Sequence, residues 1–492
     1  MTTPRRVAIL ATSLLLGLGL PGTPALAKPS PAESVAAPTL AGRLAAVESA
    51  KSINYYPSTA GWSKMWTDWN ATKVNNDLAK AAALGATNVR AVVFPAAFGY
   101  PTPRTADSSK LATFVSLAAA HGMTTRFTLF DWWDGYADIA GSTAWATRLL
   151  VPYATDRRVI SVELQNEFDA SDSDAAAWAK KIVPALRSAV PSMPLTLSVS
   201  GTAGATGMTK IKTLLAATPL DFYDFHFYGN SERALAIIRN AQRTVAPAPM
   251  VIGEVGLNTL QHSEGEQAAF LARVLQAATL AGVRSVAPWT LTDFVRGAIP
   301  PSQVARISAQ YNYGLYRTDG TAKPAAAVVQ AAFTGGAMPT GVLDNSFEAA
   351  AGQSPWSAYL PGLGLAVKTR TAAHTGEWSI SFTRTGKSAA GTPSYRVAPI
   401  TPVQPGRTWH GEVWARGRAA TGTTQISLSW FDFDDNWLGG SSSKPLPTGT
   451  TTWTKLVVNG VAPAGATSLQ IHLKSGDNTG TVWFDDVQVS TS

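Results

Sequence analysis

Val162-Glu163-Leu164-Gln165-Asn166-Glu167 is an apolar, strand-like run that ends in an Asn-Glu pair. Val251-Ile252-Gly253-Glu254 is a second run of the same kind, and it also ends in a glutamate. Short runs rich in Val, Ile and Leu are typical of strands that are buried on both faces of a parallel sheet. Both stretches therefore predict a strand that presents a carboxylate, Glu167 or Glu254, at its C-terminal end.

Similar runs recur between residues 50 and 300. The predicted strands are Ser52–Tyr56, Asn88–Phe94, Thr124–Phe130, Val159–Gln165, Leu195–Ser200, Phe222–Phe227, Met250–Val255 and Ser285–Thr290. The predicted helices between them, all rich in Ala and Leu, are Thr72–Leu84, Ser108–His121, Ala175–Val190, Met208–Ala217, Glu232–Thr244 and Glu264–Ala281. This alternation predicts an α/β fold, a (β/α)8 TIM barrel over residues 49–333. The alternative, a doubly wound open sheet, needs a Gly-rich phosphate turn after its first strand, and Asn54-Tyr55-Tyr56-Pro57 offers none.

Residues 1–27 are predicted to be a signal peptide. Arg5 and Arg6 precede the apolar stretch Val7–Leu20, and Ala25-Leu26-Ala27 is a small-residue cleavage site. The apolar stretch is shorter than the roughly 20 residues of a spanning helix, although an uncleaved anchor is the alternative. Sec and twin-arginine export both fit the arginine pair. We therefore expect a secreted, extracellular protein that has no membrane association after signal cleavage.

The segments outside the predicted barrel differ in composition. Residues 28–48 are rich in Ala, Pro and Ser and are expected to form a poorly ordered tail. Residues 334–341 contain three glycines and a proline, which is typical of a linker. Residues 342–492 consist of short alternating runs separated by Gly, Pro and Ser/Thr turns. This pattern of short alternating runs and turns predicts an all-β sandwich.

The composition excludes several classes of function. The chain has no cysteine, and its six histidines are scattered, which argues against a zinc site. The net charge of +8 is spread along the chain without a Lys/Arg-rich run, so no nucleic-acid partner is expected. The 16 tryptophans suit stacking on sugar rings and core packing equally well. We expect a monomer that needs no cofactor for catalysis.

The ends of the predicted strands carry the candidate site, because chemistry in a TIM barrel lies at the C-terminal ends of its strands. The residues at these ends are polar or aromatic: Arg90, Asp131, Trp132, Trp133, Asn166, Glu167, His226, Tyr228, Glu254 and Trp289. Two glutamates at strand ends suit catalysis in which one group transfers a proton and the other acts as the nucleophile.

In this pattern the chain resembles a known group of enzymes. Leu164-Gln165-Asn166-Glu167 on the fourth strand and Ile252-Gly253-Glu254 on the seventh resemble clan A of the retaining glycoside hydrolases. Arg90, His226-Phe227-Tyr228 and Trp289 make residues 50–333 most similar to family 5, which contains cellulases and mannanases. The resemblance implies a secreted retaining β-glycoside hydrolase that cleaves a polysaccharide or oligosaccharide.

The resemblance also implies a role for each strand-end residue. Glu167 would be the general acid/base, with a pKa raised by its surroundings, and Glu254 the nucleophile, kept ionised by Arg90. The retaining mechanism requires their carboxyl groups to lie about 5–5.5 Å apart. The remaining roles are a hydrogen bond from Tyr228 to Glu254, a contact of Asn166 with the sugar 2-hydroxyl, a substrate contact of His226 and a subsite floor at Trp289.

Several assignments stay open at this point. Glu163 is a rival of Glu167 for the acid role. Asp131 suits a substrate contact or a loop cap, and Trp132 and Trp133 suit the cleft or the core. Many family 5 enzymes have a histidine at the end of the third strand, where this chain has Phe130-Asp131, so the sugar and its linkage are not identified.

The mode of attack on a polymer is also open. Asp293–Tyr313, the long stretch after the eighth strand, is either a wall that closes one end of the cleft or an ordinary long loop. The first case favours cleavage from a chain end, and the second favours cleavage within a chain.

Residues 341–492 resemble the jelly-roll carbohydrate-binding modules that accompany many secreted glycanases. The resemblance implies a structural calcium ion at Glu348 and Asp485, since calcium prefers oxygen ligands; the alternative is that both residues cap turns. Trp414, Trp430 and Trp437 are candidates for sugar stacking, with Trp430 equally suited to the core. A second functional hypothesis follows, a non-catalytic carbohydrate-binding or cell-surface protein on a barrel scaffold.

Overall fold

The computed structural model describes residues 37–336, 344–348, 354, 356–359, 366–385, 392–397, 403–434 and 436–492. The predicted signal peptide and most of the predicted linker lie outside these ranges. Within them, no helix combines the length and the apolar character that crossing a membrane requires. The N-terminal and C-terminal folds are described separately.

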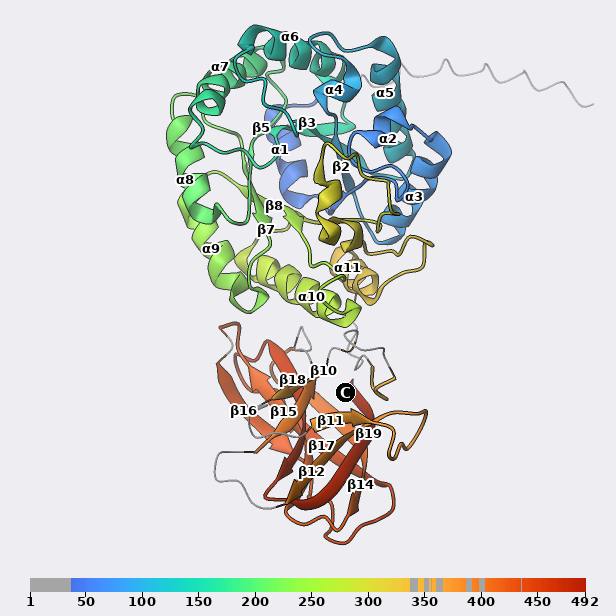
Figure 1. Ribbon diagram of the computed structural model, residues 1–492. Coiled ribbons are helices and arrows are strands. Elements are labelled where there is room, and N and C mark those ends of the chain that lie inside the picture. Colours follow the sequence, from blue (N-terminus) through green and yellow to red (C-terminus); the bar gives the residue numbers. More distant parts are fainter. Residues whose placement is uncertain are drawn as a thin grey trace, which may run out of the picture. The chain divides into compact units, whose positions relative to one another are not determined.

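Parallel strands surrounded by helices make up the N-terminal fold (Figure 1). The strands are β1 (Ser52–Asn54), β2 (Asn88–Val92), β3 (Thr124–Phe130), β4 (Val159–Gln165), β5 (Leu195–Thr196), β6 (Ser198–Val199), β7 (Tyr223–Phe227), β8 (Met250–Val255) and β9 (Val286–Pro288). They form two parallel sheets, β1-β2-β3-β4-β5 and β6-β7-β8-β9. The fifth predicted strand is divided at Leu197, and a parallel bridge from Lys51 to Val286 links the first strand to the last.

This arrangement is TIM-barrel-like, and it confirms the predicted parallel α/β order. The hydrogen-bonded ladders do not form one closed sheet, so the closure that the sequence predicted is absent from the described ladders. The open doubly wound alternative is wrong, because the strands follow one another in sequence order without a reversal.

The helices are α1 (Leu40–Ser49), α2 (Lys64–Thr67), α3 (Ala71–Ala83), α4 (Pro95–Phe98), α5 (Thr105–Ala120), α6 (Ile139–Leu150), α7 (Ser173–Ala189), α8 (Gly204–Leu214), α9 (Ala234–Val245), α10 (Glu264–Ala281) and α11 (Pro324–Thr334). The bounds of α10 match the prediction because both of its ends carry local signals. Ser263 and Glu266 form a capping box, and Gly282 ends the helix at φ 79°. Short 3-10 turns occur at 151–153, 231–233, 304–306 and 308–312.

The prediction of a poorly ordered tail over residues 28–48 is wrong for residues 40–48, which belong to helix α1, whereas residues 28–36 lie outside the described ranges. The side chain of Thr39 caps the helix, and Val47 is buried beside Ile160 and Val251 on the barrel strands. The Arg43 guanidinium donates hydrogen bonds to the carbonyl oxygens of Tyr153 and Asp156 at 3.1 and 2.9 Å. These contacts order the segment, although its Ala/Pro/Ser content alone predicts disorder.

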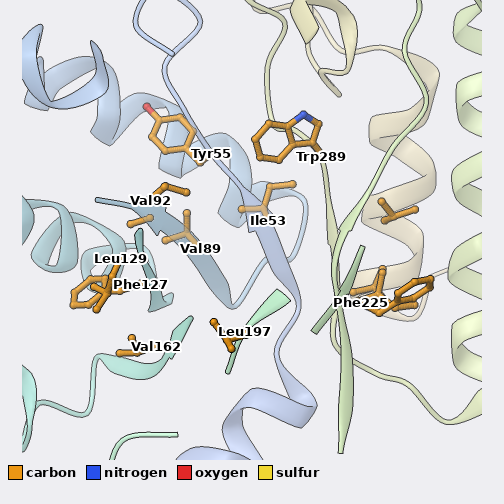
Figure 2. Close-up of a cluster of buried hydrophobic side chains, with 14 of the residues drawn as sticks. Ile53, Tyr55, Val89, Val92, Phe127, Leu129, Val162, Leu197, Phe225 and Trp289 are labelled. Carbon is orange, nitrogen blue, oxygen red and sulfur yellow. The ribbon is translucent and has the colours of Figure 1, made fainter. Parts of the chain in front are cut away.

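Buried aliphatic and aromatic side chains join neighbouring strands (Figure 2). Val89, Phe127, Val162 and Leu197 have no exposed surface, and they come from β2, β3, β4 and the break between β5 and β6. Burying one such side chain stabilises a fold by about 1.5–3 kcal/mol. The strand ends that carry the candidate site therefore rest on a rigid apolar base.

The C-terminal fold consists of antiparallel strands: β10 (Trp356–Tyr359), β11 (Ala366–Thr369), β12 (Ser379–Thr385), β13 (Ser394–Val397), β14 (Thr408–Arg418), β15 (Thr423–Phe431), β16 (Trp437–Ser442), β17 (Thr454–Val461), β18 (Ser468–Gly476) and β19 (Thr479–Thr491). They form the sheets β10-β13-β18-β15-β16 and β11-β12-β19-β14-β17. Side chains from both sheets, among them Phe382, Leu428 and Ile471, share one core. The predicted β sandwich is confirmed.

Candidate active site

A cavity of about 350 Å³ lies at the C-terminal ends of the barrel strands. It is lined by Tyr56, Trp62, Arg90, Val92, Asp131, Trp132, Asn166, Glu167, Tyr228, Glu254, Trp289, Val304, Gln310 and Tyr313. Eight of the ten strand-end residues named from the sequence are in this set, and His226 and Trp133 are not. A volume of this size lies at the lower end of the range for small-molecule sites.

The two glutamates converge on this cavity. Glu254 belongs to β8 and its side chain is 7 % exposed, whereas Glu167 follows β4 and its side chain is 40 % exposed. One carboxylate oxygen of each lies within 4.8 Å of the other and of a ring nitrogen of His226. The two carboxyl groups are therefore close enough to act on opposite sides of one sugar linkage.

The backbone around each glutamate explains how the sequence places it. Glu167 has φ 47°, a left-handed conformation that turns the chain sharply after β4, and its backbone N–H is held by Ser198 Oγ at 2.7 Å. Gly253 donates its backbone N–H to Asp224 at 2.7 Å, and a Cβ at this glycine would collide with the Asp224 carboxylate. The Gly-Glu pair on β8 thus brings the backbone close to β7.

Arg90 connects the groups of the site. Its NH1 donates to Glu254 Oε1 at 2.5 Å and to Asn54 Oδ1 at 3.1 Å, and its NH2 donates to Asn166 Oδ1 at 2.7 Å. On its other side, the Arg90 guanidinium donates two hydrogen bonds to Glu163, at 2.8 and 3.0 Å. The guanidinium therefore fixes the carboxylate of Glu254 and the amide of Asn166 together.

Glu163 is not a rival acid. It has no exposed surface, and it accepts hydrogen bonds from Arg90, from Thr128 at 2.6 Å and from Arg126 at 3.2 Å. Arg90 and Arg126 supply positive charge that outweighs the burial of this carboxyl and lowers its pKa to about 2. Glu163 is therefore a permanently charged anchor for Arg90 below the cavity.

His226 lies behind the glutamates rather than in the cavity, which corrects its predicted substrate contact. It is fully buried on β7, and its Nδ1 lies 3.1 Å from Glu167 Oε1 and 3.5 Å from Glu254 Oε2. Burial opposes its charged form, but Glu254 and Glu167 outweigh burial and raise the pKa of His226 to about 9. His226 thus holds a proton between the two carboxylates.

The direction of the pKa shift at each glutamate differs from the sequence prediction. Burial raises the pKa of Glu254, and the charges of His226 and Arg90 only partly offset it. At Glu167, burial is outweighed by the hydrogen bond and charge of His226, so its pKa is lowered. The sequence predicted a raised pKa for Glu167, because it did not show that the protonated His226 lies beside this glutamate.

Within the described ranges, two clusters could offer ligand atoms to a metal ion: Glu163, Asp224 and His226, and Glu167, His226 and Glu254. In the first, the guanidinium of Arg126 contacts both Glu163 and Asp224. In the second, the guanidinium of Arg90 binds Glu254. In both clusters the protein's own arginines supply the positive charge that a metal would bring.

The aromatic residues of the site divide between cavity and core. Trp289 is 7 % exposed, lines the cavity, and donates its indole N–H to Gln310 at 3.1 Å. Trp132 is 55 % exposed at the cavity. Trp133 instead packs between Phe130 and Trp178, with ring centroids 4.6 and 5.4 Å away. Of the two positions that the sequence left open for Trp133, cleft or core, the structure has the core, whereas Trp132, at φ 50°, lines the cavity.

Sequence reasoning missed several lining residues. Tyr56 and Trp62 follow β1, and Val92 ends β2. Val304, Gln310 and Tyr313 come from the stretch after β9, so Asp293–Tyr313 does form part of the cavity wall. Its position after the last strand was the signal available in the sequence. Tyr228 donates to Glu254 Oε2 at 2.7 Å, as the resemblance implied.

In the C-terminal sandwich, Glu348 and Asp485 bind the same loop. Glu348 accepts from the backbone N–H groups of Glu377 and Trp378 at 3.0 and 2.9 Å, and Asp485 accepts from that of His374 at 2.6 Å. The two N–H groups that Glu348 binds both reach its Oε1, and the structural calcium stays a prediction.

The three candidate stacking residues of this domain differ in exposure. Trp430 is 2 % exposed and belongs to the core, whereas Trp437 is 66 % exposed. Trp414 is half-buried and stacks on His374 at a centroid distance of 4.2 Å. Trp437 is therefore the candidate among them with a free ring surface.

No protein-family model and no curated protein matches the chain. Among solved structures it is similar to the exo-β-1,4-mannosidase Op5Man5 from Opitutaceae bacterium strain TAV5, with 18% identity and a TM-score of 0.49 over 58% of this chain and 59% of that chain. A GH5_18 protein from Streptomyces cattleya, in complex with GlcNAc, gives 17% identity and 0.49 over 58% and 80%. A family 39 glycoside hydrolase from Bacteroides cellulosilyticus WH2 gives 14% and 0.43 over 86% and 80%. The chain spans about three fifths of the first of these, and similarities this distant do not transfer an activity.

Proposed function

We propose that the protein is a retaining β-glycoside hydrolase of the family 5 type that cleaves a β-linked oligosaccharide or polysaccharide by double displacement. The observation that carries the proposal is the approach of Glu167 and Glu254 to within 4.8 Å at one cavity, with Arg90 and Tyr228 both bound to Glu254. This spacing suits direct attack by one carboxylate, whereas the inverting mechanism needs about 6.5–9.5 Å to admit a water molecule.

In the first step, Glu254 attacks the anomeric carbon while Glu167 protonates the departing glycosidic oxygen. Arg90 and Tyr228 hold Glu254 by its two different oxygens, so the carboxylate is oriented before the sugar arrives. Asn166 is oriented in turn by its hydrogen bond from Arg90 and by its own long hydrogen bond to Asp131 at 3.3 Å, and its remaining amide N–H would meet the sugar 2-hydroxyl. In the second step, Glu167 removes a proton from the water that releases the sugar.

The proton for the first step resides on the pair formed by His226 and Glu167. These groups share a hydrogen bond of 3.1 Å, and moving the proton from His226 onto Glu167 converts an ion pair into a neutral pair. A sugar that covers the partly exposed Glu167 removes water from it, and desolvation disfavours charged forms. Substrate binding therefore favours the form in which Glu167 carries the proton.

The pH profile of kcat/KM tests this arrangement. We expect activity to fall on the acid side above the ordinary glutamate pKa of about 4.3, because the pKa of Glu254 is raised and a protonated nucleophile cannot attack. We expect it to fall again as the pH passes about 9, where His226 loses the proton that it shares with Glu167. In His226→Asn the basic limb should move to lower pH. A basic limb that stays in place in this variant would contradict the shared proton.

Secretion by way of residues 1–27, action as a monomer, and sugar binding by the C-terminal sandwich complete the proposal. The calcium ion at Glu348 and Asp485 is part of it only as a prediction from residue type. The non-catalytic alternative keeps the barrel scaffold but assigns no role to the contacts of Arg90 and Tyr228 with Glu254.

The experiment that tests the proposal is a screen of the purified protein on 4-nitrophenyl β-glycosides and on a panel of β-linked polysaccharides. The proposal predicts release of nitrophenol or reducing sugar from at least one of them. Absence of turnover on every β-glycoside and every polysaccharide would favour the non-catalytic alternative.

A further inference from the structure

One carboxylate in the cavity has no part in the double displacement. Asp131 follows β3 and is 9 % exposed. Its Oδ1 accepts the backbone N–H of Trp132 at 3.1 Å and a long hydrogen bond from the Asn166 amide at 3.3 Å. Among the residues that the structure describes, its Oδ2 receives no hydrogen bond. Oδ2 is not one of the enclosed side-chain atoms that lack a partner, so a ligand in the cavity can donate to it.

A hydroxyl group without a partner lines the same cavity. Tyr56 follows β1 and is 1 % exposed, and its hydroxyl oxygen has no hydrogen-bond partner in the described part of the chain. Its ring stacks on Trp62 at 5.1 Å and meets the edge of Trp289 at 6.0 Å, so the ring cannot turn away from the cavity. Burial raises the pKa of Tyr56 and the charge of Asp131 raises it further, so this hydroxyl stays neutral and able to donate.

The two open groups complement each other chemically. Burial raises the pKa of Asp131 to about 7, so above that pH its carboxylate only accepts hydrogen bonds, whereas a tyrosine hydroxyl can donate one. A single sugar hydroxyl placed between the two groups would donate to Asp131 and accept from Tyr56. An apolar substituent at that position would leave a buried carboxylate and a buried hydroxyl unpaired, which is the condition under which sites reject analogues strongly.

We propose that Asp131 and Tyr56 together bind one hydroxyl group of the sugar ring held by the two glutamates, and that this contact selects the substrate. The inference rests on the proposed glycosidase function and deepens it. The selected hydroxyl is not the 2-hydroxyl, which faces Asn166. The substrate class is therefore a neutral β-linked sugar that carries a free hydroxyl at this second position.

The test compares monodeoxy analogues of the best 4-nitrophenyl β-glycoside in the screen, each lacking the 3-, 4- or 6-hydroxyl. With the unmodified protein, we expect one analogue to lose roughly 10⁴-fold in kcat/KM, and the others far less. This part of the test needs no variant, so it does not depend on how a substitution affects folding.

Variants then assign the sensitive hydroxyl to the two residues. In Asp131→Asn and in Tyr56→Phe, kcat/KM on the parent glycoside should fall by at least about tenfold. The loss caused by the sensitive deoxygenation should also shrink by at least about tenfold, because the partner of that hydroxyl is gone. Asp134→Asn is the matched control, an exposed carboxylate three residues away that does not line the cavity, and it should behave like the unmodified protein.

The outcomes separate this inference from the proposed function. Turnover of the parent glycoside with equal tolerance of all three deoxygenations overturns the hydroxyl contact and leaves the glycosidase standing. A sensitive position whose loss is unchanged in both variants overturns the assignment to Asp131 and Tyr56. Absence of turnover of any glycoside overturns the proposed function itself, and this inference with it.

Discussion

Glu254→Gln is expected to lower kcat on a 4-nitrophenyl β-glycoside by roughly 10⁴- to 10⁶-fold, the range seen when a group that acts as part of a catalytic unit is removed. The amide keeps the size of the carboxylate and can still accept from Tyr228, but it cannot attack the anomeric carbon. The measurement is initial-rate release of nitrophenol by purified variant and parent protein, with circular dichroism to show that both are folded.

A matched control separates the loss of a nucleophile from the loss of a charge. Glu264 on α10 is a partly exposed glutamate that pairs with Arg317 at 2.5 Å and does not line the cavity. Exposed pairs of this kind contribute about 0–1 kcal/mol. Glu264→Gln should therefore leave kcat unchanged. Retention of most of the parent activity in Glu254→Gln would show that the central assignment is wrong.

Glu167→Ala is expected to have the second largest effect, and the effect should depend on the leaving group. General acid catalysis contributes typically 10²- to 10⁴-fold, so we expect a loss of that order for oligosaccharides, whose alkoxide leaving groups need a proton. The first step with a 2,4-dinitrophenyl glycoside should be nearly unaffected, because that phenolate leaves without one. Steady-state and burst kinetics on both substrates measure the difference.

Azide provides an independent test of the same role. In Glu167→Ala, the small side chain leaves room for azide on the face of the sugar from which water would attack, and azide needs no general base. We expect azide to restore the second step and to give a β-glycosyl azide, identified by mass spectrometry and NMR. Equal losses for both leaving groups, without any glycosyl azide, would assign the acid/base role to another residue.

The fold was predictable wherever local signals and burial agreed. Thr124–Phe130, Val159–Gln165 and Met250–Val255 have the predicted bounds, and all of their residues except Thr124 are buried, as is typical of strands in a parallel sheet covered on both faces. Helix α1 could not be predicted in this way. Its order depends on Arg43, whose carbonyl partners are more than 100 residues away in the sequence.

The site was predictable in its identity and less so in its electrostatics. Glu167, Glu254, Arg90, Asn166 and Tyr228 meet at one cavity because they end neighbouring parallel strands. The position of His226 behind both glutamates is set by tertiary packing, and it reverses the expected order of their pKa values. The sequence likewise could not show that the Tyr56 hydroxyl is left without a partner.

The configuration of the first product is the most direct test of the central claim. Proton NMR of the anomeric signal, recorded in the first minutes of hydrolysis of the best β-glycoside, distinguishes the two stereochemical courses before the free sugar equilibrates. The approach of one carboxylate oxygen of Glu167 to within 4.8 Å of one of Glu254 predicts that the β-anomer appears first. Initial formation of the α-anomer would mean that water attacks the sugar directly, and the covalent role of Glu254 would be excluded.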